Sequence, residues 1–328
     1  MNILKKKINS LNHKLKAKVK EQNKNKHKEG CFVYELEADS TISSEYIFLM
    51  HFIGEIDIHL EEKIKNYLLL KQNKDGGWPL FFNGDSDISA SVKAYYALKL
   101  SGLDKNHKQM KLARDLILKK GGGEESNVFT KISLAIFGQI SWNAIPYMPI
   151  EIIKFPNWFP FNIYKISYWS RTVLIPLLII MNKKPLANNP NGIDITELFV
   201  NPRHSSSRIK PVKNSKYSKI FLYLDKVMRI TFPLIFSNKF KKNCSEDIYK
   251  WILERLNGED GLGGIFPAMV NALIALRIDE KKRFEKEIEI CKKSIDNLIV
   301  EQKETAYCQP CVSPIWDTGW MGHVLLEK

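Results

Sequence analysis

Residues 67–78 read YLLLKQNKDGGW, and residues 251–264 repeat the pattern as WILERLNGEDGLGG. In each copy an apolar helical run ends at an Asp-Gly turn, because glycine adopts backbone dihedral angles that other residues resist. A third copy, NLIVEQ at residues 297–302, lacks the Asp-Gly turn. Helix–turn–helix units that recur in this way favour helix pairs stacked in a closed ring. The sequence therefore predicts an all-α fold of the α/α toroid type.

The first turn is followed by signals for another helix. Asp87 and Ser89 are residue types that cap free backbone N–H groups at a helix start, so capping, not acid catalysis, accounts for the Asp85-Ser-Asp87 stretch. Apolar residues with helical spacing predict further helices, and no set of alternating strands is evident. The predicted helices span residues 45–59, 63–71, 89–101, 108–119, 128–137, 167–181, 245–255, 267–276, 284–300 and 318–326.

Length and composition indicate a globular protein that does not cross a membrane. The chain has 328 residues, of which 44% are apolar, enough for a large core in one or two domains. The basic N-terminus lacks the apolar run of a secretory signal, and the five cysteines are odd in number and mostly far apart, so reduced thiols in the cytoplasm are expected. The longest apolar run, residues 173–181, has nine residues and is too short to span a bilayer.

The net charge of +14 is unevenly distributed. Residues 1–30 carry ten lysines against Glu21 and Glu29. They also show apolar residues at helical spacing, which is compatible with a membrane-surface helix or a packing helix. A second basic stretch covers residues 203–219. A solvated face and an anionic lipid surface both remain open as explanations, whereas nucleic acid is not expected because no nucleic-acid module is visible.

The segment IFLYLDKVMRITFPLIF (220–236) has only three charges and follows the second basic stretch. A core helix is one interpretation. A patch that dips into a membrane without spanning it is favoured, because Phe and Tyr beside flanking lysines are typical of interfacial segments.

Further stretches occur along the chain in the order known from one protein family. They are KQNKDGGWPL (71–80), GDSDISASVKAYYALKLSG (84–102), VFTKISLAIFGQISW (128–142), MPIEIIKFPNWFPFNIYKISYWSRT (148–172), ELFV (197–200), ERLNGEDGLGGIFPAMVNALIAL (254–276) and AYCQPCVSPIWDTG (306–319). From about residue 30 onward the chain resembles the squalene–hopene cyclases, a class II triterpene cyclase family. It departs from the family where Leu262, Phe32 and Tyr34 stand at positions that usually carry tryptophan.

The resemblance implies how the chain is organised. Gln72, Gly77 and Trp78 match the family's QW repeat, which staples neighbouring helices. Residues 1–30 would belong to a second, incomplete α/α barrel, 31–309 would form an inserted α/α barrel with a membrane-facing segment at 219–237, and 310–328 would begin the barrel that carries the catalytic acid. The family's D-x-D-D motif, which supplies the initiating proton, follows the stretch like SPIWDTG, so the acid is expected beyond Lys328.

The resemblance also implies a cavity and a channel. Aromatic faces can stabilise a desolvated carbocation by roughly 2 kcal/mol or more each without trapping it. Core packing remains the alternative for the aromatic residues, helix capping for the glutamate, and loop-to-helix packing for the channel residues. The implied cavity residues are Trp169, Trp316, Phe129 and Glu45, and the implied channel constriction is Ile265, Phe266 and Pro267.

No metal site is predicted. Cys308 and Cys311 have the C-x-x-C spacing of a redox couple or half a zinc site. However, no second Cys/His pair of matching spacing accompanies them, and His323 alone is a poor complement. A zinc-dependent prenyltransferase is therefore disfavoured. Asp317 is interpreted as a helix cap or a hydrogen-bonding support.

By resemblance, the expected activity is cyclisation of squalene, or a similar polyprene, to hopene without a cofactor. Because the acid is absent from the sequence, this chain is expected to be inactive alone and to act with a C-terminal half encoded downstream. A non-catalytic lipid- or partner-binding remnant is the alternative. The expected location is the cytoplasmic face of an anionic membrane, as a peripheral or monotopic protein.

Overall fold

The computed structural model describes residue 10 and residues 31–326 except 160–161, 190, 202–217, 259 and 281. The described residues divide into two compact units. Residues 37–310 form the larger unit, and residues 31–36 belong with 311–326 to the smaller one. The predicted basic helix within residues 1–30 and nearly all of the basic stretch at 203–219 lie outside the described residues.

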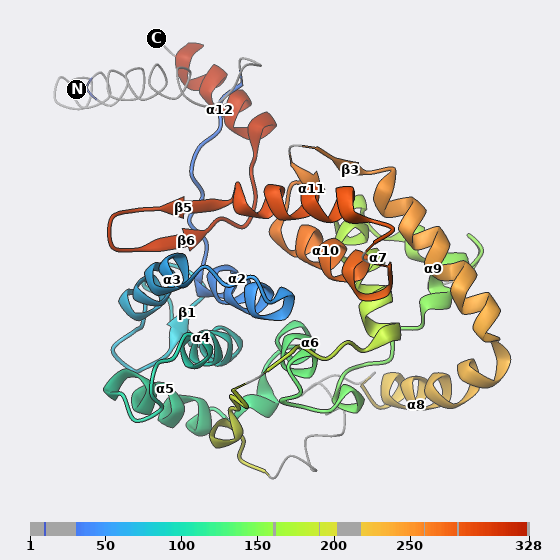
Figure 1. The fold of residues 1–328 in the computed structure, drawn as a ribbon, viewed down its shortest axis with the longest axis horizontal. Helices are drawn as coiled ribbons and strands as arrows, with labels where there is room; N and C mark the ends of the chain where they lie inside the picture. The colour runs from blue at the N-terminus through green and yellow to red at the C-terminus, as the bar shows by residue number, and fades with distance from the viewer. Residues whose placement is uncertain are drawn as a thin grey trace. The chain divides into compact units, whose positions relative to one another are not determined.

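Helices dominate the larger unit, so the all-α prediction is confirmed (Figure 1). Short 3₁₀ turns connect several of them, at Gly123–Glu125, Trp142–Ala144, Ile150–Lys154, Ile163–Lys165 and Thr196–Leu198. Three two-stranded antiparallel hairpins also occur, β1 with β2, β3 with β4 and β5 with β6. The helices are α2 (Ser40–Ile53), α3 (Ile58–Leu70), α4 (Ile88–Leu100), α5 (Lys108–Lys119), α6 (Val128–Ile136), α7 (Tyr168–Lys183), α8 (Ser218–Ile235), α9 (Asn238–Leu253), α10 (Phe266–Glu280) and α11 (Glu285–Asp296).

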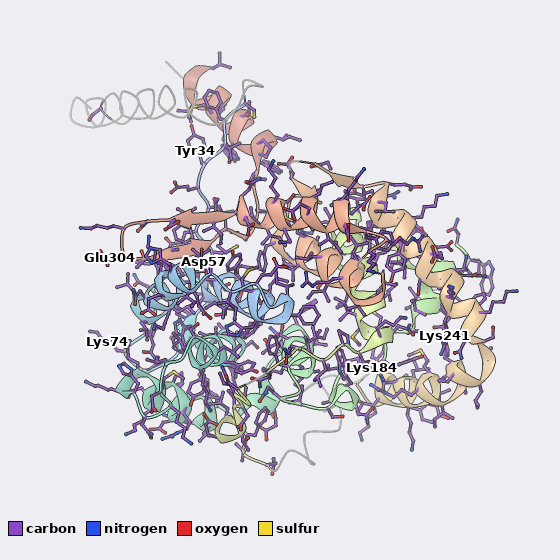
Figure 2. All side chains as sticks on the ribbon, viewed as in Figure 1. Tyr34, Asp57, Lys74, Lys184, Lys241 and Glu304 are labelled. Atoms are coloured by element: carbon purple, nitrogen blue, oxygen red, sulfur yellow. The ribbon has the colours of Figure 1, made fainter. Side chains whose placement is uncertain are left out.

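The first repeat turn, which we define as residues 72–78, joins α3 to strand β1 (Trp78–Pro79). The Gln72 amide donates to the Gly76 carbonyl at 2.7 Å and to the Gln109 carbonyl in α5 at 2.9 Å. The Trp78 side chain is completely buried, and its indole N–H donates to the Leu68 carbonyl at 2.8 Å. These bonds tie the turn to α3 behind it and to α5 beside it. In Figure 2 Lys74 marks the turn at the outer edge of the helices.

Gly77 allows a close approach that any other residue would prevent. A Cβ atom at this position would lie 2.3 Å from a Leu116 methyl carbon in α5 and 2.5 Å from the Ser86 Cβ in β2 (Ser86–Asp87). The turn also contains an internal brace, because the Asp75 carboxylate accepts from the Gly77 N–H and from the Ser86 hydroxyl. The turn therefore depends on glycine for its packing as well as for its bend.

Helix α4 follows the first hairpin and forms the centre of the first half of the larger unit. Asp87 caps it, as predicted, by accepting from the Ala90 N–H at 2.9 Å. Ser89 does not cap α4, because its hydroxyl accepts instead from the N–H of Asn127. Every residue of α4 except Ile88 and Lys99 is buried. The helix packs against α2 and α5 on the left of Figure 1.

The second half of the larger unit is centred on α10. This helix packs against α7 and α11, and α7 also packs against α9. The second repeat turn joins α9 to the hairpin of β3 (Leu256–Asn257) and β4 (Gly261–Leu262). In this hairpin Asn257 pairs with Gly261, and Leu262, fully buried, stands at the position that Trp78 occupies in the first copy.

The predicted helix at 45–59 was wrong in its limits, because two helices share these residues. Asp39 caps α2 by accepting from the Thr41 N–H, so the helix begins at Ser40, five residues earlier than predicted. The helix ends at Gly54, whose φ of 74° is costly for any residue with a side chain. Asp57 then caps α3. A cap of the same kind sets the start of α9, which begins at Asn238 directly after its cap Ser237 and therefore earlier than the predicted residue 245.

The third copy of the repeat also differs from the prediction. The helix predicted for 284–300 ends at Asp296, and strand β5 (Ile299–Glu301) pairs with β6 (Ala306–Cys308). The chain reverses between these strands without an Asp-Gly turn. Strands of two or three residues are too short to show the alternation by which a strand is predicted from sequence.

In the smaller unit, the segment of residues 31–36 is hydrogen-bonded to helix α12 (Pro314–Leu326). The Asp317 carboxylate accepts from the Tyr34 N–H, and the Thr318 hydroxyl accepts from the Phe32 N–H, each at 2.9 Å. Asp317 is therefore a hydrogen-bonding support, as predicted, and α12 begins four residues before the limit predicted for it. None of the described helices has both the length and the apolar character needed to cross a bilayer.

Candidate functional site: an apolar pocket in the larger unit

A pocket of about 430 Å³ lies in the larger unit, between helices α2, α4, α6, α7 and α10. Its volume lies within the range of about 300 to 1,000 Å³ that small-molecule sites occupy. Aliphatic and aromatic side chains make up most of the wall, and a few polar groups interrupt it. We refer to this site as the pocket.

Phe129 and Trp169 present aromatic surface in the pocket. Asn127 caps α6 and Ser167 caps α7, and each aromatic residue lies in the first turn after its cap. The side chains remain 49% and 56% exposed, respectively. Their surface is therefore accessible to a ligand and is not consumed by packing within the protein.

Behind this open surface lies a packed aromatic cluster of Phe48, Tyr96 and Phe137. The ring centroids are 5.4 to 5.6 Å apart, and the Tyr96 and Phe137 rings meet edge to face. Phe48 and Phe137 also line the pocket, whereas Tyr96 lies fully buried in α4. Sequence reasoning missed this cluster. Phe137 falls inside a quoted family stretch, but nothing in its spacing separates it from an ordinary core residue.

Only two of the three predicted channel residues line the pocket. Ile265 and Pro267 line the pocket, at the start of α10. Phe266 lies between them in sequence, but its side chain is completely buried and is not among the lining residues of the pocket. Its N–H donates to the Pro310 carbonyl, which fixes the start of the helix. The channel role of these residues stays a prediction.

Glu45 lies at the pocket in α2, and its partner is a residue that sequence reasoning missed. The Lys93 ammonium in α4 lies 2.5 Å from Glu45 Oε1, and the Lys93 side chain is only 6% exposed. One charged residue inside an otherwise buried helix was the available signal, because lysine is almost never fully buried without a partner. The pair introduces two charges into a wall that is otherwise mostly apolar.

Trp316 lies in α12 of the smaller unit and is 71% exposed. The structure does not place this unit relative to the pocket. The assignment of Trp316 to the same cavity as Trp169 therefore stays a prediction.

The two cysteines of the C-x-x-C stretch lack the features of reactive thiols. Cys308 is buried in β6, and burial raises its pKa well above the usual value. Burial also raises the pKa of Cys311. A raised pKa keeps a thiol protonated, whereas metal binding and thiol exchange require the thiolate. Within the described part of the chain, no group of three or more His, Cys, Asp or Glu residues is arranged to hold a metal ion.

Comparison with known proteins places this architecture in a family. The sequence model of the squalene–hopene cyclase N-terminal domain matches residues 15–304. The squalene–hopene cyclase of Bradyrhizobium diazoefficiens is 44% identical over 302 residues, which cover 91% of this chain and 46% of that protein. The corresponding enzyme of Alicyclobacillus acidocaldarius is 32% identical over 298 residues, covering 89% and 46%.

A dammaradiene synthase from Dryopteris crassirhizoma is 28% identical over 300 residues, which cover 92% of this chain and 44% of the synthase. The chain thus spans about half the length of the curated relatives that it matches. The family match also supports the toroid type of the predicted α/α fold. By its match to the N-terminal domain over most of its length, this chain belongs to the squalene–hopene cyclase family.

Proposed function

We propose that the chain supplies one wall of a cyclase cavity that binds squalene or a similar polyprene. The observation that carries the proposal is the pocket, in which Phe129 and Trp169 keep their aromatic surface accessible in an otherwise mostly aliphatic wall. A long hydrocarbon binds by burying apolar area, and aromatic faces can also stabilise a positive charge that develops along it. Both properties suit a reaction that proceeds through carbocations.

In this proposal the initiating acid comes from sequence that corresponds to the second half of the relatives. A carbon–carbon double bond is a weak base, so its protonation needs a strong acid in a site that excludes water. The carboxylates of the described pocket are Asp39 and Glu45. Asp39 is the cap of α2, and Glu45 is paired with Lys93. Neither is suited to initiate the reaction, so in this proposal the pocket acts together with sequence that corresponds to the second half of the relatives.

We further propose that α8 attaches the protein to a membrane surface. Two charged residues of this helix are turned inward, because Asp225 accepts from the Tyr147 N–H while Arg229 donates to Asp225 and to the Ile145 carbonyl. The apolar side is left exposed, with Leu234 reaching 81%. A surface helix usually turns its apolar side to the core, so this amount of exposed apolar area is unusual. The exposed apolar residues of α8 are Ile220, Phe221, Tyr223, Leu224, Ile230, Leu234 and Ile235.

A membrane-bound position agrees with the chemistry of the substrate. A polyprene is dissolved in the lipid bilayer, so an enzyme that takes it up gains from a surface helix that contacts the acyl chains. Lys219 and Lys226 lie on the same helix and can contact anionic headgroups.

The catalytic proposal can be tested by supplying sequence that corresponds to the second half of a relative. The chain is co-expressed with the C-terminal half of the Bradyrhizobium relative, which is 44% identical over the matched region. Squalene is added to the purified complex, and products are identified by gas chromatography and mass spectrometry. We expect a cyclised product that neither half forms alone and that Trp169→Ala strongly reduces. A stable complex that leaves squalene unchanged would contradict the proposal.

The membrane proposal has its own test, which uses sedimentation with vesicles of neutral phosphatidylcholine. Replacing Leu234 and Phe221 with aspartate removes two exposed apolar side chains, each worth about 2 kcal/mol when buried in lipid, so binding should fall more than tenfold. Phe82→Asp is the matched control, because Phe82 is as exposed but lies in the first hairpin. Equal loss in the control would contradict a specific role for α8.

A further inference from the structure

Another cavity, of about 470 Å³, lies in the larger unit between the end of α7 and helix α9. We refer to it as the basic pocket, because its polar wall contains three lysines and one carboxylate. Figure 2 marks its two sides by Lys184, which directly follows the last residue of α7, and by Lys241 in α9. The lining residues are Asn182, Lys183, Asn238, Lys241, Lys242, Ser245, Glu246 and Tyr249.

The carboxylate of the basic pocket is already matched by a cation from outside it. Glu246 accepts two hydrogen bonds from Arg283, at 2.7 and 2.9 Å, and these bonds hold the pKa of Glu246 below its usual value. Within the described part of the chain, the ammonium groups of Lys241 and Lys242 have neither an ion pair nor a hydrogen bond. The positive charge of these lysines is therefore not consumed by the protein.

Two further carboxylates occur nearby, and neither supplies the missing negative charge. Asp247 pairs with Lys154. Glu151 belongs to the 3₁₀ turn that packs against α9, and it is only 1% exposed. Burial raises the pKa of Glu151 more than the nearby Lys241 lowers it. Because burial favours its neutral form, Glu151 competes weakly for the Lys241 ammonium, and the basic pocket keeps an excess of positive charge.

Neutral groups of the basic pocket can add hydrogen bonds to an anion. The side-chain amides of Asn182 and Asn238 each offer two N–H donors, and among the described residues neither side chain has a hydrogen-bond partner. Asn238 is also the first residue of α9, a helix of 16 residues. The dipole of such a helix favours negative charge at its N-terminal end. The cavity thus combines unpaired cations, amide donors and a helix start.

The basic pocket lies directly behind the exposed apolar end of α8. Phe236, in the turn from α8 to α9, stacks on Phe240 with ring centroids 5.1 Å apart and contacts Phe232 at 5.3 Å. These contacts hold the start of α9 against the end of α8, where Leu234 is 81% exposed. A membrane that receives this end of α8 would bring its headgroups to the level of the basic pocket.

We propose that the basic pocket binds a phosphate monoester, and that the headgroup of an anionic lipid is the source that its position favours. A phosphate monoester carries a charge of about −1.5 to −2 at pH 7 and three strong acceptor oxygens. These properties match two unpaired lysines with amide donors beside them, whereas a phosphate diester has one charge and fewer acceptors. The inference rests on the proposed membrane contact of α8 only for the source of the phosphate.

The lipid source is tested by sedimentation of the full chain with two kinds of phosphatidylcholine vesicle. One kind contains phosphatidic acid, a monoester, and the other contains phosphatidylglycerol, a diester, in amounts that give the same zeta potential. Attraction by surface charge alone would be equal for both. A hydrogen bond to a charged group changes affinity by roughly tenfold. We therefore expect the wild type to bind the phosphatidic acid vesicles about tenfold more tightly.

Two double variants separate the basic pocket from general surface charge. Lys241→Gln with Lys242→Gln removes two charges of the basic pocket and should abolish the preference for phosphatidic acid. Lys219→Gln with Lys226→Gln is the matched control, because it removes two lysines of α8 that lie outside the basic pocket. The control should weaken binding to both kinds of vesicle alike and leave their ratio unchanged. A preference that survives the loss of Lys241 and Lys242 would overturn the lipid assignment.

A soluble arm distinguishes a lipid headgroup from a small phosphate. Glycerol 3-phosphate is titrated into the protein without vesicles and followed by calorimetry, with glycerol as the blank. Binding that depends on Lys241 and Lys242, without any preference between the vesicles, would uphold the phosphate site with a soluble ligand. If neither arm depends on these lysines, the inference is overturned. The attachment of α8 to neutral vesicles is measured separately, so the failure of either proposal leaves the other testable.

Discussion

The first repeat turn and the pocket use the same residue types in opposite ways. At the turn, Trp78 is completely buried and its indole N–H is bonded to the Leu68 carbonyl. At the pocket, Trp169 keeps more than half of its surface exposed. The two lysines of α4 differ likewise, since Lys99 has two acceptors and Lys93 has one. Complete burial and bonding indicate a structural role, whereas open aromatic surface and unused hydrogen-bonding capacity indicate a place for a ligand.

The largest expected effect is on the structural side of this comparison. Trp78→Ala removes a fully buried indole and leaves the Leu68 carbonyl without its donor. Truncation of a buried tryptophan costs about 3–5 kcal/mol. Unfolding in urea, followed by circular dichroism, should show this loss. A change below about 1 kcal/mol would mean that the turn does not hold the helices together.

A smaller effect is expected when the first turn is made to resemble the second. Leu256 stands in the second copy where Gln72 stands in the first, at a constant offset from the buried apolar residue that ends each turn. Gln72→Leu removes the donors to the Gly76 and Gln109 carbonyls and should cost about 1–3 kcal/mol in the free energy of unfolding.

Leu256→Gln is the matched control for this change. Leu256 lies opposite Leu262 in the hairpin of β3 and β4, so the substitution replaces an apolar side chain there and should not stabilise the protein. Equal and opposite effects of the two substitutions would contradict the view that only the first turn uses its glutamine. Both values come from the same urea titration.

On the pocket side, Trp169→Ala should affect ligand binding more than stability. A ligand that covers about 100 Å² of the exposed indole gains about 2 kcal/mol from it, so the affinity for squalene should fall tenfold or more. The free energy of unfolding should change by less than about 1 kcal/mol, because this surface is already open. Trp169→Phe should retain most of the affinity. A variant that loses stability but keeps its affinity for squalene would show that Trp169 is a structural residue and not a ligand-binding one.

The smallest effect concerns the pH dependence of stability at the ion pair of Lys99 and Glu197. Burial alone would raise the pKa of Glu197, but hydrogen bonds from Lys99 and Tyr95 outweigh it and hold the pKa below 4.5. Because the folded pKa is lowered, the contribution is complete at neutral pH and is lost as the pH falls through the lowered pKa of the folded state. Thermal unfolding between pH 3 and 7 should be less acid-sensitive in Glu197→Gln. Identical profiles would contradict a stabilising role for the pair.

Much of the structural side could be predicted from the sequence, because it depends on local rules. Asp87 was predicted as a cap from its residue type and position, and the family pattern selected Gln72 and Trp78. The boundary at Gly54 was missed because the apolar spacing continues across it. The short hairpins were missed because strands of two or three residues carry no periodic signal.

The pocket was less accessible to prediction, because tertiary packing decides which side chains stay open. Trp169 and Phe129 were predicted from the family resemblance, but only the structure distinguishes their exposure from the burial of Trp78. Lys93 was missed, since its role depends on Glu45, which lies 48 residues away in sequence. Likewise, the sequence of α8 favours an interfacial helix, but its inward-turned Asp225 and Arg229 become evident only from their contacts.

Amide hydrogen exchange with and without squalene, measured by mass spectrometry in the same detergent, tests the central claim most directly. If the pocket binds the polyprene, peptides from α6 and α7 that carry Phe129 and Trp169 should exchange more slowly when squalene is added. Peptides from the first repeat turn, residues 72–78, should exchange at an unchanged rate. Protection of the turn without protection of α6 and α7, or no protection anywhere at saturating squalene, would contradict the account.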